Sequence, residues 1–92
     1  IGVNPATGKA PEGTLAQAQQ VFENIKTVLA ELGADTGDVL KTTVFLTNIA
    51  DFSEVNKLYA EVFGPDYPAR TCVEVSALPM GLSIEVECIA KA

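Results

Sequence analysis

The chain has 92 residues, which suits one small domain spanning residues 1–92, and its composition of 48% hydrophobic and 20% charged residues is too apolar for a disordered chain. The net charge of −6 disfavours a nucleic-acid or anionic-membrane partner, because affinity for phosphate groups comes from Lys and Arg. The sequence has no histidine and no apolar run of about 18 residues, which excludes Ser-His-Asp or Cys-His catalysis and a membrane-spanning helix.

The first predicted element is an amphipathic helix over residues 15–32, preceded by a Gly- and Pro-rich loop. Its apolar residues recur at i, i+3 and i+4, the spacing that places them on one face of a helix. Thr14 and Gln17 have the spacing of a capping box at its start. Gly33 is suited to the left-handed conformation that commonly follows a helix.

A strand and a second helix follow. Residues 38–47 are rich in β-branched and aromatic residues, which favours a strand. Residues 52–63 repeat the helical apolar spacing, with Asp51 available as a cap and Gly64-Pro65 ending the helix.

The last two predicted elements are strands at about 69–77 and 83–91. The intervening Leu78-Pro79-Met80-Gly81 has the length of a hairpin loop, so the two strands are expected to pair in antiparallel fashion. The order helix, strand, helix, strand, strand predicts an α+β fold, with a sheet covered on one face by two helices.

Side chains alternate between the two faces of each strand. The face covered by the helices is predicted to carry Leu40, Thr42, Val44, Leu46, Thr71, Val73, Val75, Ile84, Val86 and Cys88. The uncovered face is predicted to carry Val39, Lys41, Thr43, Phe45, Arg70, Cys72, Glu74, Ser76, Glu85, Glu87 and Ile89. Apolar side chains among opposite charges on this second face suit a subunit interface that contains a site.

Arg70 is the first candidate site residue, because its planar fork can hold a carboxylate through two parallel hydrogen bonds. The same spacing also allows a cross-strand ion pair with Glu85 or Glu87, and spacing alone leaves both interpretations open. A carboxylate on this face could orient or deprotonate a water molecule. Cys72, placed beside Arg70, is either a nucleophile or, as is commoner, a small buried thiol.

The two cysteines, Cys72 and Cys88, are predicted on opposite faces of the sheet, so a disulfide is not expected. Reduced thiols suit an intracellular, cytoplasmic protein. Tyr59 and Tyr67 are interpreted as core and loop packing rather than as acid catalysts.

Several stretches resemble one known family over the whole chain and in the correct order: VNPATGK, KTTVFL, VNKLYAEVF, YPARTCVEV and IEVECIA. Together they look like the reactive-intermediate deaminase (RidA/YjgF-like) family, and PARTCVEV is the most specific of them. The resemblance implies a chorismate-mutase-like homotrimer, with small carboxylic acids bound in clefts between subunits. It also implies that family members carry a further N-terminal segment, with Gly-Pro-Tyr and Ser-Gly-Gln motifs, so this chain is expected to be N-terminally short.

The activity implied by the resemblance is hydrolysis of reactive enamines and imines, such as 2-aminoacrylate, to a 2-keto acid and ammonia. No metal or organic cofactor is implied. Arg70 matches the carboxylate-binding arginine, and Glu85 matches the residue that positions the attacking water. Cys72 and Asn56 match residues that line the substrate pocket.

Three other functions remain open at the level of sequence. The chain could form a non-catalytic trimer that binds small carboxylates, a ribonuclease-like translation inhibitor, or a chaperone-like holdase. The net charge of −6 and the absence of a basic cluster count against RNA as a partner.

Overall fold

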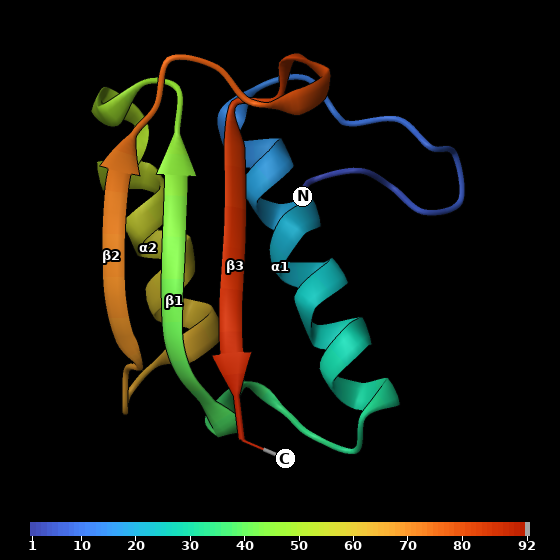
Figure 1. Ribbon diagram of the computed structural model, residues 1–92, viewed down its shortest axis with the longest axis vertical. Coiled ribbons are helices and arrows are strands. Elements are labelled where there is room, and N and C mark those ends of the chain that lie inside the picture. Colours follow the sequence, from blue (N-terminus) through green and yellow to red (C-terminus); the bar gives the residue numbers. More distant parts are fainter. Residues whose placement is uncertain (92) are drawn as a thin grey trace.

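The computed structural model describes residues 1–91 and places both helices on the same side of a three-stranded sheet (Figure 1). The elements in chain order are α1 (Thr14–Glu31), β1 (Val39–Leu46), α2 (Phe52–Phe63), β2 (Ala69–Glu74) and β3 (Ile84–Ala90). The predicted α+β class and the layer arrangement are confirmed, and so are the bounds of α2. Within the described residues, neither helix combines the length and apolar composition that a membrane crossing requires.

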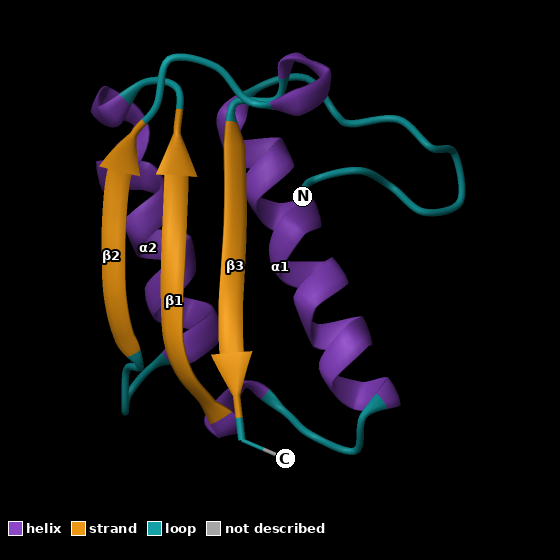
Figure 2. Ribbon diagram, in the orientation of Figure 1, coloured by secondary structure: helices purple, strands orange, loops and turns teal. Residues whose placement is uncertain are grey.

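The strand order is β2-β1-β3, with β1 parallel to β2 and antiparallel to β3 (Figure 2). The predicted hairpin between the last two strands is therefore wrong. The connection between them passes over the end of β1, where the backbone N–H of Val75 donates to Leu46 and that of Thr47 donates to Ser83. The length of the loop between β2 and β3 suits a direct hairpin as well as a connection across β1, so the central position of β1 could not be inferred from it.

The start of β1 departs from the predicted alternation. Thr42, Val44 and Leu46 are buried beneath the helices as expected, but Leu40 is 56% exposed whereas Val39 is only 6% exposed. The register with β3 shifts between Val39 and Lys41, and such an irregularity exchanges the two faces locally.

β2 faces the opposite way from the prediction. Arg70 lies opposite Thr42 and Cys72 opposite Val44, so Arg70 and Cys72 share the face that carries the helices. Thr71 and Val73 consequently lie on the open face, which is the face of the sheet that the helices leave uncovered. Because β2 is an outer strand that the helices cover only partly, a charged side chain on its helix side still reaches solvent.

Glu85 and Glu87 lie opposite Phe45 and Thr43 on the open face of the sheet, as predicted. Glu74, at the end of β2, is opposite Leu46, and its carboxylate accepts a hydrogen bond of 2.8 Å from the backbone N–H of Ile49. Arg70 and Glu85 are thus on opposite faces of one sheet, which corrects their predicted placement on a common face.

The core lies between the sheet and the two helices, with an aromatic cluster at its centre. Phe22 of α1 makes edge contacts with Tyr59 and Phe63 of α2, at 6.1 and 5.9 Å between ring centres. Tyr59 and Phe63 are 4.7 Å apart. Edge-to-face geometry adds to the stabilisation that burial of aromatic side chains provides.

The predicted capping box at α1 does not form, because Gly13 occupies the N-cap position and Thr14 is already helical. Thr14 instead donates a hydrogen bond of 2.8 Å to the carboxylate of Asp51, ahead of α2. The buried side chain of Gln17 accepts a hydrogen bond from the N–H of Ser83 and donates to the carbonyl oxygen of Pro11. Both residues therefore connect α1 to other segments. At its other end, Gly33 has the predicted positive φ of 74°.

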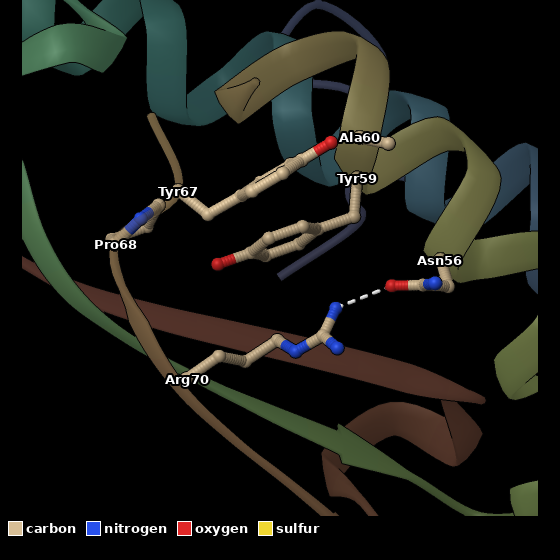
Figure 3. A pocket seen from close by; sticks show the side chains of 6 residues that line it. All are labelled: Asn56, Tyr59, Ala60, Tyr67, Pro68 and Arg70. Atoms are coloured by element: carbon tan, nitrogen blue, oxygen red, sulfur yellow. Dashed lines mark hydrogen bonds between the residues drawn. The ribbon is translucent and has the colours of Figure 1, made fainter. Parts of the chain in front are cut away.

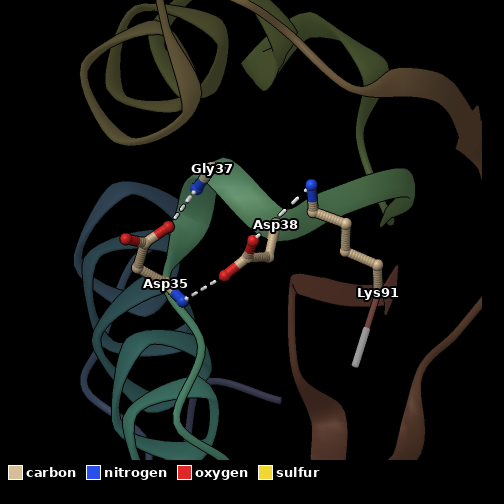
Figure 4. A network of polar contacts seen from close by, with 4 residues as sticks. All are labelled: Asp35, Gly37, Asp38 and Lys91. Atoms are coloured by element: carbon tan, nitrogen blue, oxygen red, sulfur yellow. Dashed lines mark hydrogen bonds and ion pairs between the residues drawn. The ribbon is translucent and has the colours of Figure 1, made fainter.

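A polar network fixes the entry to β1 (Figure 4). The Asp35 carboxylate accepts a hydrogen bond from the N–H of Gly37, and the Asp38 carboxylate accepts one from the N–H of Asp35. Lys91 donates its backbone N–H to the Asp38 carbonyl oxygen, and its ammonium lies 4.0 Å from the Asp38 carboxylate. The start of β1 is thereby attached to the end of β3.

Removing one partner of the buried hydrogen bond between Thr42 and Tyr59 is expected to destabilise the fold. The two hydroxyl oxygens are 2.7 Å apart, and the residues are 1% and 2% exposed. Thr42→Val leaves the Tyr59 hydroxyl without a partner, which should lower the free energy of unfolding by about 1–3 kcal/mol in urea titrations. Thr42→Val combined with Tyr59→Phe should cost less than the sum of the two single changes. Additive costs would contradict the hydrogen bond.

Candidate functional site

A pocket of about 420 Å³ opens where the outer strand β2 meets α2 (Figure 3). The helix and the strand supply its polar groups, and the segment between them supplies an aromatic ring and a proline. It is lined by Asn56, Tyr59, Ala60, Tyr67, Pro68 and Arg70. Two of the predicted site residues, Arg70 and Asn56, therefore meet in one concavity.

Arg70 is held against α2 by three contacts. Its Nη1 donates a hydrogen bond to the Asn56 side-chain oxygen (Figure 3). Its guanidinium carbon lies 5.1 Å from the centre of the Phe52 ring and 4.7 Å from that of Tyr59. Phe52, Asn56 and Tyr59 recur at i, i+4 and i+7 and so lie on one stripe of the helix. The stripe orients the arginine by cation–π attraction and one hydrogen bond.

The guanidinium remains available to an anion. An arginine has five N–H donors, and the bond to Asn56 uses one of them. Within residues 1–91, Arg70 forms no ion pair with any carboxylate, and Glu85 and Glu87 are on the other face of the sheet. The predicted alternative, a cross-strand ion pair with one of these glutamates, is not formed. The pocket can thus receive a planar anion such as a carboxylate.

Cys72 follows Arg70 on the same face of β2 and packs against the edge of the core. Burial raises the pKa of the Cys72 thiol above its ordinary value, and the positive charge of Arg70 opposes only part of that shift. The thiol is therefore protonated at neutral pH, which favours the interpretation of a small half-buried side chain over that of a nucleophile.

Cys88 packs against the core from the helix side of β3, so the two cysteines share a face and the prediction of opposite faces is wrong. The expected absence of a disulfide still has a physical basis. β1 lies between their strands, which separates them by roughly 9–10 Å, too far for a sulfur–sulfur bond. Both are free thiols.

Alkylation of Cys72 by iodoacetamide is expected to be slow at neutral pH. Because burial raises its pKa, the reactive thiolate fraction is smaller in the folded protein than in the unfolded chain at the same pH. The rate should rise as the pH increases beyond the ordinary thiol pKa. The measurement uses a Cys88→Ser variant, so that one thiol is followed by mass spectrometry, with the urea-unfolded chain as the control. Faster labelling of the folded than of the unfolded chain at pH 7 would contradict it.

Glu85 is half-buried on the open face, opposite Phe45, and takes no part in the pocket of the same chain. The sheet separates it from Arg70 and Cys72. One copy of the chain therefore brings together Arg70, Asn56 and Cys72, whereas Glu85 lies apart from them.

Three residues at the site were not predicted there: Phe52, Tyr59 and Tyr67. Tyr59 belongs to the core, as predicted, but one face of its ring also contacts Arg70. Phe52 and Tyr59 have helical spacing around Asn56. This spacing indicates a site for Arg70 only in combination with the position of β2 alongside α2. Tyr67 is 57% exposed and carries no such signal.

A mixed sheet with both helices on one face, and an outer-strand arginine that forms no ion pair within residues 1–91, defines a small α+β protein suited to bind a compact anion. The chain belongs to the family described as Endoribonuclease L-PSP, whose model matches residues 1–92. The resemblance to RidA/YjgF proteins inferred from the motifs is confirmed.

Three relatives illustrate the similarity. A 2-iminobutanoate/2-iminopropanoate deaminase of Escherichia coli is 44% identical over 93 residues, which cover 98% of this chain and 73% of the enzyme. The Rid family protein YyfA of Yersinia pestis superposes with a TM-score of 0.97 at 46% identity, covering 100% of this chain and 75% of that one. The YjgF gene product of E. coli superposes with a TM-score of 0.89 at 41% identity, covering 98% and 73%.

Proposed function

We propose that this protein hydrolyses 2-imino acids and their enamine tautomers, of the 2-aminoacrylate type, to 2-keto acids and ammonia. The observation that carries the proposal is the oriented, unneutralised guanidinium of Arg70 in a pocket of about 420 Å³. The similarity to an enzyme named 2-iminobutanoate/2-iminopropanoate deaminase supports this choice among small carboxylic acids.

The reaction requires mainly that the protein position the imine and the attacking water. Arg70 binds the substrate carboxylate through two of its free N–H groups, with Asn56 and Cys72 beside it. A protonated imine carbon is already electrophilic, so water adds to it and gives a carbinolamine. Collapse of the carbinolamine expels ammonia, which leaves as ammonium, and forms the keto group. Holding water and imine in the reacting geometry is the main catalytic contribution.

Glu85 is proposed to position that water from a neighbouring copy of the chain. Since Arg70 and Glu85 occupy opposite faces of one sheet, both can reach one substrate only if two copies meet. The open face offers an interface of mixed character: Lys41, Thr43, Phe45, Thr71, Val73, Glu85, Glu87 and Ile89. We propose a chorismate-mutase-like homotrimer built through this face, with the sites between subunits. A cytoplasmic location stays a prediction.

The name of the matching family raises RNA cleavage as a second activity. The chain has 6 basic against 12 acidic residues, a balance that disfavours binding to a phosphate backbone. A carboxylate-binding trimer without turnover is the more relevant competitor, because it would use the same pocket.

The test combines an assay of turnover with the state of assembly. A 2-imino acid is generated in situ by an amino-acid oxidase, and the added protein is expected to accelerate ammonia release. Sedimentation at micromolar concentration should give a trimer of the 9.7 kDa chain. Binding of 2-oxobutanoate without faster ammonia release would favour the non-catalytic trimer, and cleavage of a labelled RNA would favour the ribonuclease. A monomer that is nevertheless active would refute the shared site.

A further inference from the structure

We propose that Phe52 and Tyr59 are positioning residues for the carboxylate-binding arginine, an inference that rests on the proposed function. Their rings hold the guanidinium of Arg70 in its binding orientation before the substrate arrives. They do so without supplying a negative charge that the substrate would have to displace. Neither ring needs to touch the substrate for this role.

The first step of the argument concerns charge. The chain has twice as many acidic as basic residues, so carboxylates are available as partners for an arginine at its surface. Arg70 forms no such pair within residues 1–91. Its guanidinium carbon instead lies 4.7 and 5.1 Å from the centres of two aromatic rings, which attract a cation through their quadrupoles. The positive charge is thereby held in place and left unneutralised.

The second step concerns rigidity. The Tyr59 ring is fixed at its hydroxyl by Thr42, at 2.7 Å, and packs along its sides against Phe22 and Phe63. It is 2% exposed and forms part of the core. A long arginine side chain loses considerable rotamer freedom when it binds a ligand. Packing against a ring that is itself held in the core removes part of that freedom beforehand, and preorganisation of this kind increases affinity.

The third step concerns direction. Asn56 accepts from Nη1, whereas Nε and Nη2 donate no hydrogen bond within the described residues. The edge formed by Nε and Nη2 is one of the two forks through which an arginine binds a carboxylate. The rings fix the plane of the guanidinium and Asn56 fixes its rotation within that plane. The substrate carboxylate is therefore expected at the Nε–Nη2 edge.

The test compares ring removal with an equal loss of core volume. Tyr59→Leu and Phe52→Leu should each raise the Kd for 2-oxobutanoate roughly 3- to 30-fold, the range that corresponds to one cation–π contact. Tyr59→Phe keeps the ring and should bind within about 2-fold of the wild type. Phe63→Leu is the matched control. It removes a ring of the same buried cluster that makes no cation–π contact with Arg70, and its Kd should rise by less than in either ring variant, because both rings over the guanidinium remain.

A second readout needs no ligand. Protons above an aromatic ring are shifted upfield in NMR spectra, so the Nε–H resonance of Arg70 should be shifted upfield in the free protein. The shift should persist in Tyr59→Phe and Phe63→Leu and should shrink in Tyr59→Leu. An unshifted resonance in the wild type would show that the two rings do not hold the guanidinium in solution, and would overturn the inference.

The outcomes separate this inference from the proposed function. If Arg70→Ala loses 2-oxobutanoate binding while Tyr59→Leu and Phe52→Leu change the Kd no more than Phe63→Leu does, the positioning role is wrong and the site stands. If Arg70→Ala binds 2-oxobutanoate normally, the proposed site is wrong, and the positioning role is overturned with it. Weaker binding in both ring variants, with affinity retained in Tyr59→Phe, supports the inference.

Discussion

Arg70→Ala is expected to abolish measurable binding of 2-oxobutanoate while the protein stays folded. Two hydrogen bonds between a guanidinium and a carboxylate contribute about 3 kcal/mol or more, so the Kd should rise by at least about 10²-fold in calorimetric titrations. Arg70→Lys should also lose most of the affinity, because an ammonium group cannot reproduce the two-bond fork. The free energy of unfolding should fall by only about 1 kcal/mol, because the contacts with Phe52, Asn56 and Tyr59 are made by an exposed arginine.

The control is Lys57→Ala, which removes the same charge from the exposed surface of α2, one position beyond Asn56. It should leave the affinity unchanged, because Lys57 does not line the pocket. Equal loss of affinity in Lys57→Ala and Arg70→Ala would indicate a general effect of net charge and would argue against a specific fork.

Glu85→Gln is expected to lower kcat by about 10²–10⁴, the usual contribution of a positioned acid–base group, with little change in affinity for a keto acid. Glutamine keeps the shape and hydrogen-bonding capacity of the side chain but cannot accept a proton. Loss of kcat without loss of binding is the signature of an interaction made in the transition state. Glu87→Gln, two residues along the same face, is the matched control, and its kcat should stay near that of the wild type.

Mixing the two inactive subunits tests whether the site is shared. Arg70→Ala and Glu85→Gln chains are co-expressed with different tags, so that mixed trimers can be purified and counted. If Arg70 and Glu85 act from different subunits, each mixed trimer contains one site with both residues intact, and random assembly should restore about a quarter of the wild-type activity. If both residues act within one chain, the mixture should be as inactive as its parts.

The helices were predictable from the sequence because their signals are local. The recurrence of apolar residues gave α2 at its observed bounds and α1 within one residue. The strand order was not predictable in this way, because Leu78-Pro79-Met80-Gly81 has a suitable length for a hairpin and the sequence does not show that β1 lies between the two strands.

The faces of β2 show a second limit of local patterns. Alternation correctly grouped Arg70 with Cys72 and separated both from Val73, but it could not tell which group faces the helices. The more apolar group was expected inside, which holds for a central strand covered along its length. The helices cover the outer strand β2 only partly, so its polar group can lie on the helix side and still reach water. The pairing of Arg70 with the α2 stripe follows from this arrangement.

The position of β2 and β3 at the two edges of the sheet also bears on solubility. Outer strands present backbone N–H and C=O groups along their free side, and such edges can pair with a second chain in a non-native way. The net charge of −6 opposes such encounters by repulsion between copies, and salt weakens that repulsion. Pairing through the strand edges should therefore increase with ionic strength, which separates it from the proposed assembly through the open sheet face. Low-salt buffers should keep isolated subunits dispersed, whereas high salt should favour edge-to-edge aggregates.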